Sequence, residues 1–149
     1  MIAPSLVIAV IRHGSDEYRQ AVELRDAVLR RPLGLRLNEE ELAVESQPAY
    51  VHIAALRDGA VIGTVLMIRE SETVARMRQF AIAPPFQKQG LGGQIIAFAE
   101  EIAQEWGGSE LWLNARMTAA GFYDRMGYDR EGDEFIEHTI AHIRMRKAL

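Results

Sequence analysis

Residues 79–96, QFAIAPPFQKQGLGGQII, run from an apolar segment through two prolines and a polar stretch into three glycines. These glycines stand at the start of an expected helix, where they cost conformational entropy but permit positive φ and close approach to a ligand. The free N–H groups and the positive end of the helix dipole there favour a phosphate or pyrophosphate. The alternative is a tight strand-to-helix turn in which small residues only permit close packing.

Two familiar nucleotide-binding motifs do not fit this stretch. The motif GxxxxGK[ST] is absent, because the only nearby lysine, Lys88, precedes the glycines. A GxGxxG motif begins at Gly90 and Gly92 but fails at Ile95, and it should follow a first parallel strand rather than three antiparallel strands. The sequence therefore argues against an unrelated enzyme on a Rossmann sheet.

The composition indicates one globular domain spanning residues 1–149, with 48% apolar and 26% charged residues. The chain has no cysteine, which excludes disulfides, thiolate nucleophiles and cysteine-ligated metals. A net charge of -4 argues against a nucleic-acid partner. The apolar run near the start has no basic leader and is far shorter than the ~20 residues of a membrane span, so we expect a cytoplasmic protein without membrane association.

Hydrophobic periodicity and turn residues predict a strand, a helix, three strands, a helix, a strand, a helix and a closing strand or two. This order predicts an α/β (α+β) fold in which a single mixed, mostly antiparallel sheet is flanked by helices. The strands are expected at 5–11, 50–56, 60–68, 73–83, 110–115 and within 133–145. The helices are expected from Ser15 or Asp16 to Pro32, around 39–45, at 90–106, and from a Thr118 cap to Gly127.

The run from Gln87 to Gly92 matches the pattern Q/R-x-x-G-x-G/A, and here the sequence resembles the GNAT superfamily of acyl-CoA-dependent N-acyltransferases. Residues 113–129, LNARMTAAGFYDRMGYD, are similar to that superfamily's fifth strand and following helix. The ending GDEFIEHTIAHIRMRK is similar to a subgroup with an H-x-x-M-like strand. The resemblance covers nearly the whole chain.

The resemblance implies acetyl-CoA as co-substrate. Loop N–H groups would hold its pyrophosphate, the backbone of the fourth strand would pair with pantetheine, and the Ile82 N–H would face the thioester oxygen. Three of the implied residues also have alternative roles. Phe122 could pack in the core, Arg125 could be a solvated charge on its helix, and Asn114 could cap the end of a strand. The full implied set is Phe80, Ala81, Ile82, Gln87, Lys88, Gln89, Gly90, Leu91, Gly92, Gly93, Asn114, Phe122 and Arg125.

The expected reaction is direct attack of a neutral amine on the thioester through a tetrahedral intermediate. Tyr123 fills the tyrosine position of the matched pattern and is our candidate acid for the departing thiolate; its alternative role is a core aromatic. The fourth strand carries no carboxylate to act as base. Glu70 or Glu72, His142 or Glu137, or no side chain at all, remain alternatives for that base.

Two arginines of the fourth strand, Arg76 and Arg78, either meet an acidic substrate group or the CoA phosphates, or are surface charges paired with glutamates. We favour the paired surface charges. Glutamates 39–41 either attract a cationic amine or form a solvated face. The remaining histidines, His13, His52 and His138, have no metal-ligand spacing, so no metal site is predicted.

The sequence therefore predicts an N-acetyltransferase acting on a small-molecule amine, with a protein amine as the alternative acceptor. A second hypothesis is an acyl-CoA-binding sensor or interaction module without turnover. The retained glycines and Tyr123 favour the enzyme, and the missing carboxylate on the fourth strand favours the module. An exposed closing strand would allow a homodimer.

Overall fold

The computed structural model describes residues 5–149 and contains one seven-stranded sheet in the order β1-β2-β3-β4-β5-β7-β6. All neighbouring strands are antiparallel except β4 and β5. The predicted mixed, mostly antiparallel fold is therefore confirmed. The strands are β1 (Leu6–Ile11), β2 (Tyr50–Arg57), β3 (Ala60–Arg69), β4 (Val74–Ile82), β5 (Glu110–Arg116), β6 (Asp129–Glu137) and β7 (Ile140–Ala148); the α-helices are α1 (Asp16–Arg25), α2 (Glu39–Ala43), α3 (Leu91–Glu105) and α4 (Met117–Arg125).

Local sequence explains where several elements begin and turn. The Ser15 side chain caps α1 by accepting a hydrogen bond from the Tyr18 N–H at 3.1 Å. Asp58 and Gly59, with φ of 50° and 82°, join β2 to β3, as the two-residue hairpin turn requires. Gly107, with φ of 87°, follows the end of α3.

Several boundaries differ from the sequence-based prediction, and three of the differences are informative. Thr118 does not cap α4, because the helix already begins at Met117 and its N-cap position is Arg116, which makes no side-chain cap bond. The strand β6 begins at Asp129, four residues before the expected tail strand at 133. Beyond α1 the chain continues through a π-helical turn, residues 26–30, and a short 3-10 turn, residues 31–33.

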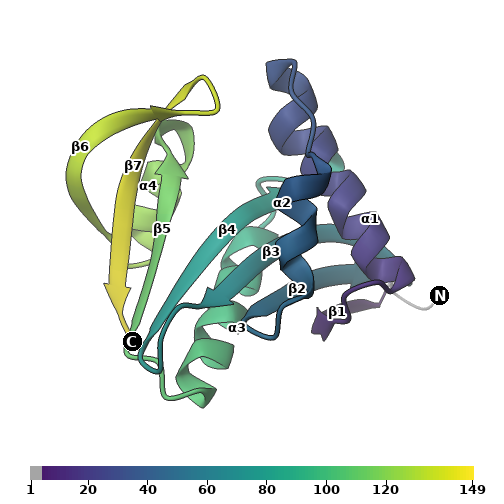
Figure 1. Ribbon diagram of the computed structural model, residues 1–149, viewed down its shortest axis with the longest axis horizontal. Coiled ribbons are helices and arrows are strands. Elements are labelled where there is room, and N and C mark those ends of the chain that lie inside the picture. Colours follow the sequence, from purple (N-terminus) through teal and green to yellow (C-terminus); the bar gives the residue numbers. More distant parts are fainter. Residues whose placement is uncertain (1–4) are drawn as a thin grey trace.

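The helices cover both faces of the sheet. Figure 1 shows α1 and α2 over one face of β1–β4, with α3 on the opposite face and α4 behind β5 and β7. The larger core lies under α3 and α4 and includes Ile53, Met67, Ile95 and Leu111. A smaller core under α1 contains Ile11, Tyr18, Ala21 and Ala54. None of the helices within residues 5–149 is long and apolar enough to cross a lipid bilayer.

The middle of the sheet opens between β4 and β5. Their parallel pairing covers only residues 74–76 of β4 and 110–112 of β5, and Figure 1 shows the two strands diverging beyond it. From Met77 onward, this edge of β4 therefore has no strand partner among residues 5–149. The opening provides the space in which the candidate site is built.

A β-bulge in β4 accompanies this opening. The β3–β4 register shifts after Thr64, and Gln79 has a φ of 55°, which is unusual for a residue other than glycine. The Gln79 side chain is held from the α1 side, where its Oε1 accepts a hydrogen bond from Arg25 Nε at 2.7 Å. This contact stabilises a backbone conformation that costs energy by itself.

Candidate active site

The glycine turn presents a row of unpaired backbone amides. Lys88 and Gly90 have φ of 60° and 85°, so the chain bends sharply before α3. Among residues 5–149, the N–H groups from Lys88 to Gly93 have no hydrogen-bond acceptor, and the first amide with one is that of Gln94. Consecutive free amides at a helix start form an anion-binding concavity. The turn therefore fits a pyrophosphate.

Side chains hold this turn in place from behind. Gln87 Nε2 donates to the Ile82 carbonyl at 2.8 Å, and Gln89 Nε2 donates to the Pro85 carbonyl at 2.8 Å. Both glutamines therefore act through their side chains on the backbone of the turn. The turn is thus fixed before any ligand is bound.

The glycines of the turn have different roles. Gly90 needs its freedom for positive φ, and a Cβ there would meet no atom within 4 Å. At Gly92 a Cβ would lie 3.1 Å from the Phe80 ring and 3.4 Å from Phe122, so this glycine permits close packing. The two alternatives posed by the sequence, a ligand-binding bend and a packing requirement, therefore apply to different glycines of one turn.

The other residues expected near acetyl-CoA differ in their surroundings. Phe80, Ala81 and Ile82 lie on the part of β4 beyond its pairing with β5, and Asn114 lines the opening. Phe122 stacks on Phe80 with ring centroids 5.9 Å apart, so it has a packing role. Leu91 is buried in the larger core, whereas Lys88 and Arg125 are exposed. The cofactor roles of these residues stay predictions.

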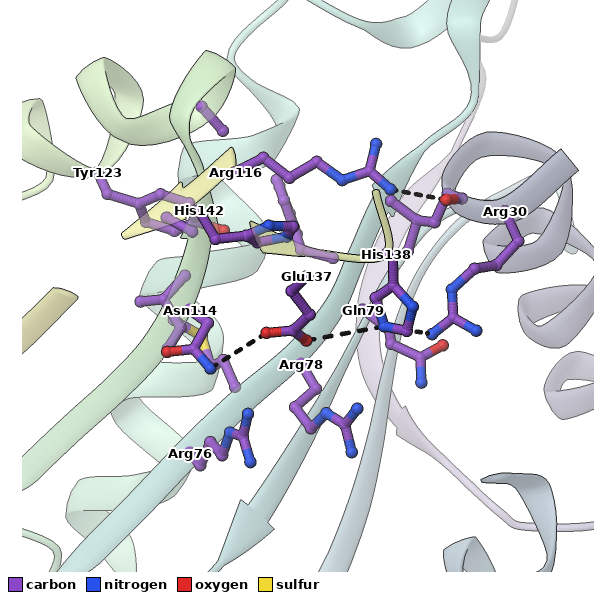
Figure 2. Close-up of a pocket in the computed structure, with 16 residues that line it drawn as sticks. Arg30, Arg76, Arg78, Gln79, Asn114, Arg116, Tyr123, Glu137, His138 and His142 are labelled. Atoms are coloured by element: carbon purple, nitrogen blue, oxygen red, sulfur yellow. Dashed lines mark hydrogen bonds and ion pairs between the residues drawn. The ribbon is translucent and has the colours of Figure 1, made fainter. Parts of the chain in front are cut away.

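A cavity of about 120 Å³ occupies the opening between β4 and β5. It is bounded by β4, β5, α4, the turn after α1 and the β6–β7 hairpin. Figure 2 shows its labelled side chains converging from these separate elements. The lining residues are Leu29, Arg30, Arg76, Met77, Arg78, Gln79, Phe80, Leu113, Asn114, Ala115, Arg116, Ala119, Tyr123, Glu137, His138 and His142.

Tyr123, from α4, lines this cavity although only 3% of its surface is exposed. Burial raises the pKa of its hydroxyl well above the ordinary value of 10.0, so the group stays protonated at neutral pH. Within residues 5–149 this hydroxyl has no hydrogen-bond partner. By contrast, the neighbouring Tyr128, also buried, donates its hydroxyl to Glu100 at 2.9 Å. Tyr123 therefore has the protonation state that a general acid requires.

His142, from β7, reaches the same cavity and is 5% exposed. Its Nδ1 lies 2.9 Å from the Ile140 carbonyl oxygen. A carbonyl oxygen only accepts hydrogen bonds, so Nδ1 carries the proton, and in the neutral ring Nε2 keeps its lone pair. The ring also stacks on Phe135 at 5.9 Å, which fixes its orientation. This tautomer suits a proton acceptor.

Glu137 is the one carboxylate that lines the cavity within the described part of the chain. Asn114 Nδ2 donates to it at 3.4 Å, and His138 Nε2 lies 3.7 Å away. Burial and the charge of Arg30 lower the pKa of His138, and Arg30 donates to the same Nε2 at 3.3 Å. His138 is therefore neutral and forms no ion pair with Glu137.

The other carboxylates considered from the sequence lie elsewhere. Glu70 is exposed and accepts a hydrogen bond from Trp112 Nε1 at 2.6 Å, and Glu72 is also exposed; neither lines the cavity. Glu41 forms an ion pair with Arg30 at 2.8 Å. Glutamates 39 and 40 are exposed at the start of α2. Glu137 and His142 are thus the base candidates that the cavity brings together.

One expectation for basic residues requires correction, and three lining residues were not predicted. Arg76 and Arg78 line the cavity, and neither makes an ion pair with a glutamate in residues 5–149, so the prediction of paired surface charges is wrong. Sequence reasoning also missed Arg30, Arg116 and His138 as lining residues. No local pattern marks these three, because the chain brings them together from the turn after α1, the end of β5 and the β6–β7 turn. No group of three potential metal ligands occurs in residues 5–149.

Comparison with known proteins agrees with this geometry. The family model described as an acetyltransferase (GNAT) domain matches residues 19–149. The chain belongs to the GNAT acetyltransferase family. It is 28% identical over 152 residues to the aminoalkylphosphonate N-acetyltransferase of Salmonella typhimurium, with 95% of this chain and 92% of the relative covered.

Solved GNAT structures share the fold. An acyl-CoA N-acyltransferase from Pseudomonas aeruginosa superimposes with a TM-score of 0.83 at 23% identity, covering 97% of this chain and 100% of the other. A GNAT family acetyltransferase from Elizabethkingia anophelis with acetyl-CoA bound gives 0.72 at 17% identity, covering 97% and 98%. The resemblance deduced from the glycine turn and the α4 segment is thereby confirmed.

Proposed function

We propose that this GNAT protein transfers an acetyl group from acetyl-CoA to the primary amine of a small molecule. The observation that carries the proposal is the opening between β4 and β5, where Tyr123 and His142 line one cavity beside an unpaired strand edge. An acid that stays protonated and a base with a free lone pair are the two groups that amine acylation requires.

Acetyl-CoA fits the residues that adjoin this cavity. The amides from Lys88 to Gly93 would hold its pyrophosphate, and the free edge of residues 80–82 would pair with pantetheine as an added strand does. When bound, acetyl-CoA supplies the activated acyl group. The Elizabethkingia relative carries acetyl-CoA, which supports the same co-substrate here.

Two side chains move protons in the proposed reaction. His142 Nε2 accepts the proton of the acceptor's ammonium group, and the freed nitrogen lone pair attacks the thioester carbonyl carbon. The nitrogen of the tetrahedral intermediate loses its second proton to water, and the carbon–sulfur bond breaks as the neutral amide forms. Tyr123 then donates its hydroxyl proton to the departing thiolate, and the tyrosinate recovers a proton from water.

A small acceptor fits the cavity, and the name of one relative favours it over a protein amine. About 120 Å³ holds a molecule of a few heavy atoms next to Tyr123 and His142. The Salmonella relative is named for a small-molecule amine, an aminoalkylphosphonate. A panel of short amines is therefore the appropriate substrate screen.

Replacing the tyrosine hydroxyl tests the proposal. We expect Tyr123→Phe to lower kcat about 10²- to 10⁴-fold, the usual range for a general acid, with acetyl-CoA affinity unchanged. The measurement is thiol release from acetyl-CoA across the amine panel, with calorimetry for affinity. Tyr128→Phe is the matched control, because its hydroxyl bonds Glu100 and does not line the cavity.

The same assay separates the two base candidates. We expect His142→Gln to lower kcat about 10²-fold or more. We expect Glu137→Gln to change kcat less, because the Asn114 amide already donates to this carboxylate, whereas His142 Nε2 has no hydrogen-bond partner in residues 5–149. Acetyl-CoA binding without thiol release on any amine, and no loss in Tyr123→Phe, would instead establish the acyl-CoA-binding module.

A further inference from the structure

The charges that line the cavity are unequally compensated. Of its arginines, Arg30 is held by the Glu41 carboxylate at 2.8 Å, and Arg116 donates to the Leu29 carbonyl at 2.6 Å. Arg76 and Arg78 make no ion pair or hydrogen bond within residues 5–149. Figure 2 shows these two guanidinium groups next to each other. The cavity therefore contains two adjacent cations without a protein partner.

Arg76 is held in place without being neutralised. Its guanidinium lies over the Trp112 ring, 4.4 Å from the centroid, and Arg144 lies over the same ring at 4.0 Å. Trp112 is in turn fixed by its hydrogen bond to Glu70. The Arg76 Nε is buried and has no hydrogen-bond partner within the described residues. A buried donor left unpaired costs free energy that a bound acceptor recovers.

The position of the pair separates it from the glycine turn. Arg76 lies six residues before Ile82 on β4, a separation of about 20 Å at roughly 3.3 Å per residue. The glycine turn follows Ile82, so the pair lies toward the opposite end of the strand from the amides of the turn. These arginines therefore face the acceptor end of the opening rather than the expected pyrophosphate site.

The two cations also destabilise one another. Burial lowers the pKa of Arg76, and the charge of Arg78 lowers it further, whereas Glu70 and Glu137 act in the opposite direction. Guanidinium groups bind carboxylate and phosphate oxygens through paired N–H donors. Glu137, in the same cavity, carries the charge that attracts an ammonium group. The cavity thus holds a carboxylate that suits an ammonium group and two guanidinium groups that suit an oxyanion, as a small molecule with both charges requires.

We propose that Arg76 and Arg78 bind an oxyanion group of the acceptor, a carboxylate or a phosphate, so that the substrate class is a small zwitterionic amine. This inference depends on the proposed acetyl transfer in one respect only, that the amine of the bound molecule is the group that is acetylated. The oxyanion site itself is a binding property that does not require turnover.

The first experiment measures this binding directly. Calorimetry on the full chain saturated with CoA uses two probes that lack an amine, propionate and ethyl phosphate, which separate the carboxylate from the phosphate. We expect at least one probe to bind wild type. Arg76→Gln and Arg78→Gln should each weaken that binding about 10- to 100-fold, while CoA affinity is unchanged.

Arg144→Gln is the matched control, since Arg144 also lies over the Trp112 ring and carries the same charge but does not line the cavity. Near-ultraviolet circular dichroism verifies that each variant is folded, and Arg78→Lys keeps the charge while losing the paired donors. No binding of either probe to wild type, or equal binding in both Gln variants, would overturn the proposal.

The second experiment compares turnover of matched amines: β-alanine against propylamine, and O-phosphoethanolamine against ethanolamine. We expect kcat/KM to favour the charged member of one pair about 10-fold or more, with the preference lost in Arg78→Gln through KM. Equal turnover within both pairs would overturn the oxyanion site and leave acetyl transfer standing. Probe binding without turnover of any amine would leave the oxyanion site standing and overturn acetyl transfer.

Discussion

Two arginine sites next to β4 have opposite surroundings. On the α1 side, Arg25 donates to both oxygens of Glu45 at 2.8 and 2.6 Å, and each of these side chains is 2% exposed. On the side that faces β5, Arg76 and Arg78 line a cavity without a carboxylate partner in the described residues. Both sites hold guanidinium groups close to the same strand, and only one of them is neutralised within the protein.

This difference separates a structural role from a ligand-binding role. The Arg25–Glu45 pair also joins Tyr18, whose hydroxyl donates to Glu45 at 2.9 Å, and it holds Gln79 at the β-bulge. Among the described residues, no buried side-chain nitrogen or oxygen of that cluster lacks a hydrogen-bond partner. The positive charges of Arg76 and Arg78 are neutralised only when a bound ligand supplies a negative charge. Stability should therefore depend on the Arg25–Glu45 pair, and activity on Arg76 and Arg78.

The largest expected effect is on the paired side. Glu45→Gln removes the carboxylate and leaves the buried Arg25 without a counter-charge, so we expect a loss of about 3–5 kcal/mol in the free energy of unfolding. Urea denaturation followed by circular dichroism measures it. A loss below about 1 kcal/mol would mean that the buried pair does not hold the bulge, and the comparison would fail.

Acid should weaken the same pair without a mutation. Burial acts to raise the pKa of Glu45, but the hydrogen bonds and charge of Arg25 outweigh it and leave this pKa below its ordinary value of 4.5. The pair's contribution is therefore complete above pH ~4.5 and is lost as pH falls through the lower pKa of the folded state. Because the amide introduced by Glu45→Gln cannot titrate, we expect the stability gap between wild type and this variant to narrow below pH ~4.5. A constant gap down to pH ~3 would contradict this.

The smallest effect is expected on the cavity side. Arg78→Gln removes a charge with no protein partner, so the free energy of unfolding should change by less than about 0.5 kcal/mol. The same urea titration measures it, with the denaturant slope as a check that the unfolded state is unchanged. A loss above about 1 kcal/mol in the free energy of unfolding would give Arg78 a structural role and remove the contrast between the Arg25–Glu45 pair and the arginines of the cavity.

Much of the fold was predictable because its determinants are local. The β2–β3 hairpin follows from Asp58-Gly59 between two apolar runs, and α1 follows from a capping serine before an apolar stripe. The predicted start of α4 was wrong by two residues, because β5 passes directly into the helix at Met117 and the N-cap position is Arg116 rather than Thr118. Local propensity does not indicate such a direct junction.

The candidate site was predictable only in part. The glycine turn, Tyr123 and His142 were proposed from pattern and resemblance, and the structure places the latter two in one cavity, where their catalytic roles stay predictions. Whether each arginine is paired with a carboxylate could not be predicted from the sequence. Arg30 is satisfied by Glu41, and Arg76 is not satisfied by any glutamate, because pairing depends on distances between elements far apart in the chain.

The stacked indole of Trp112 gives this protein a built-in optical probe. Its ring is in contact with Arg76 and Arg144, and the only other tryptophan in the chain is Trp106, beside Arg69 just after α3. A ligand that draws Arg76 away from the ring changes the polarity around this chromophore. Emission of a Trp106→Phe protein therefore reports occupancy of the arginine pair in real time, without a label.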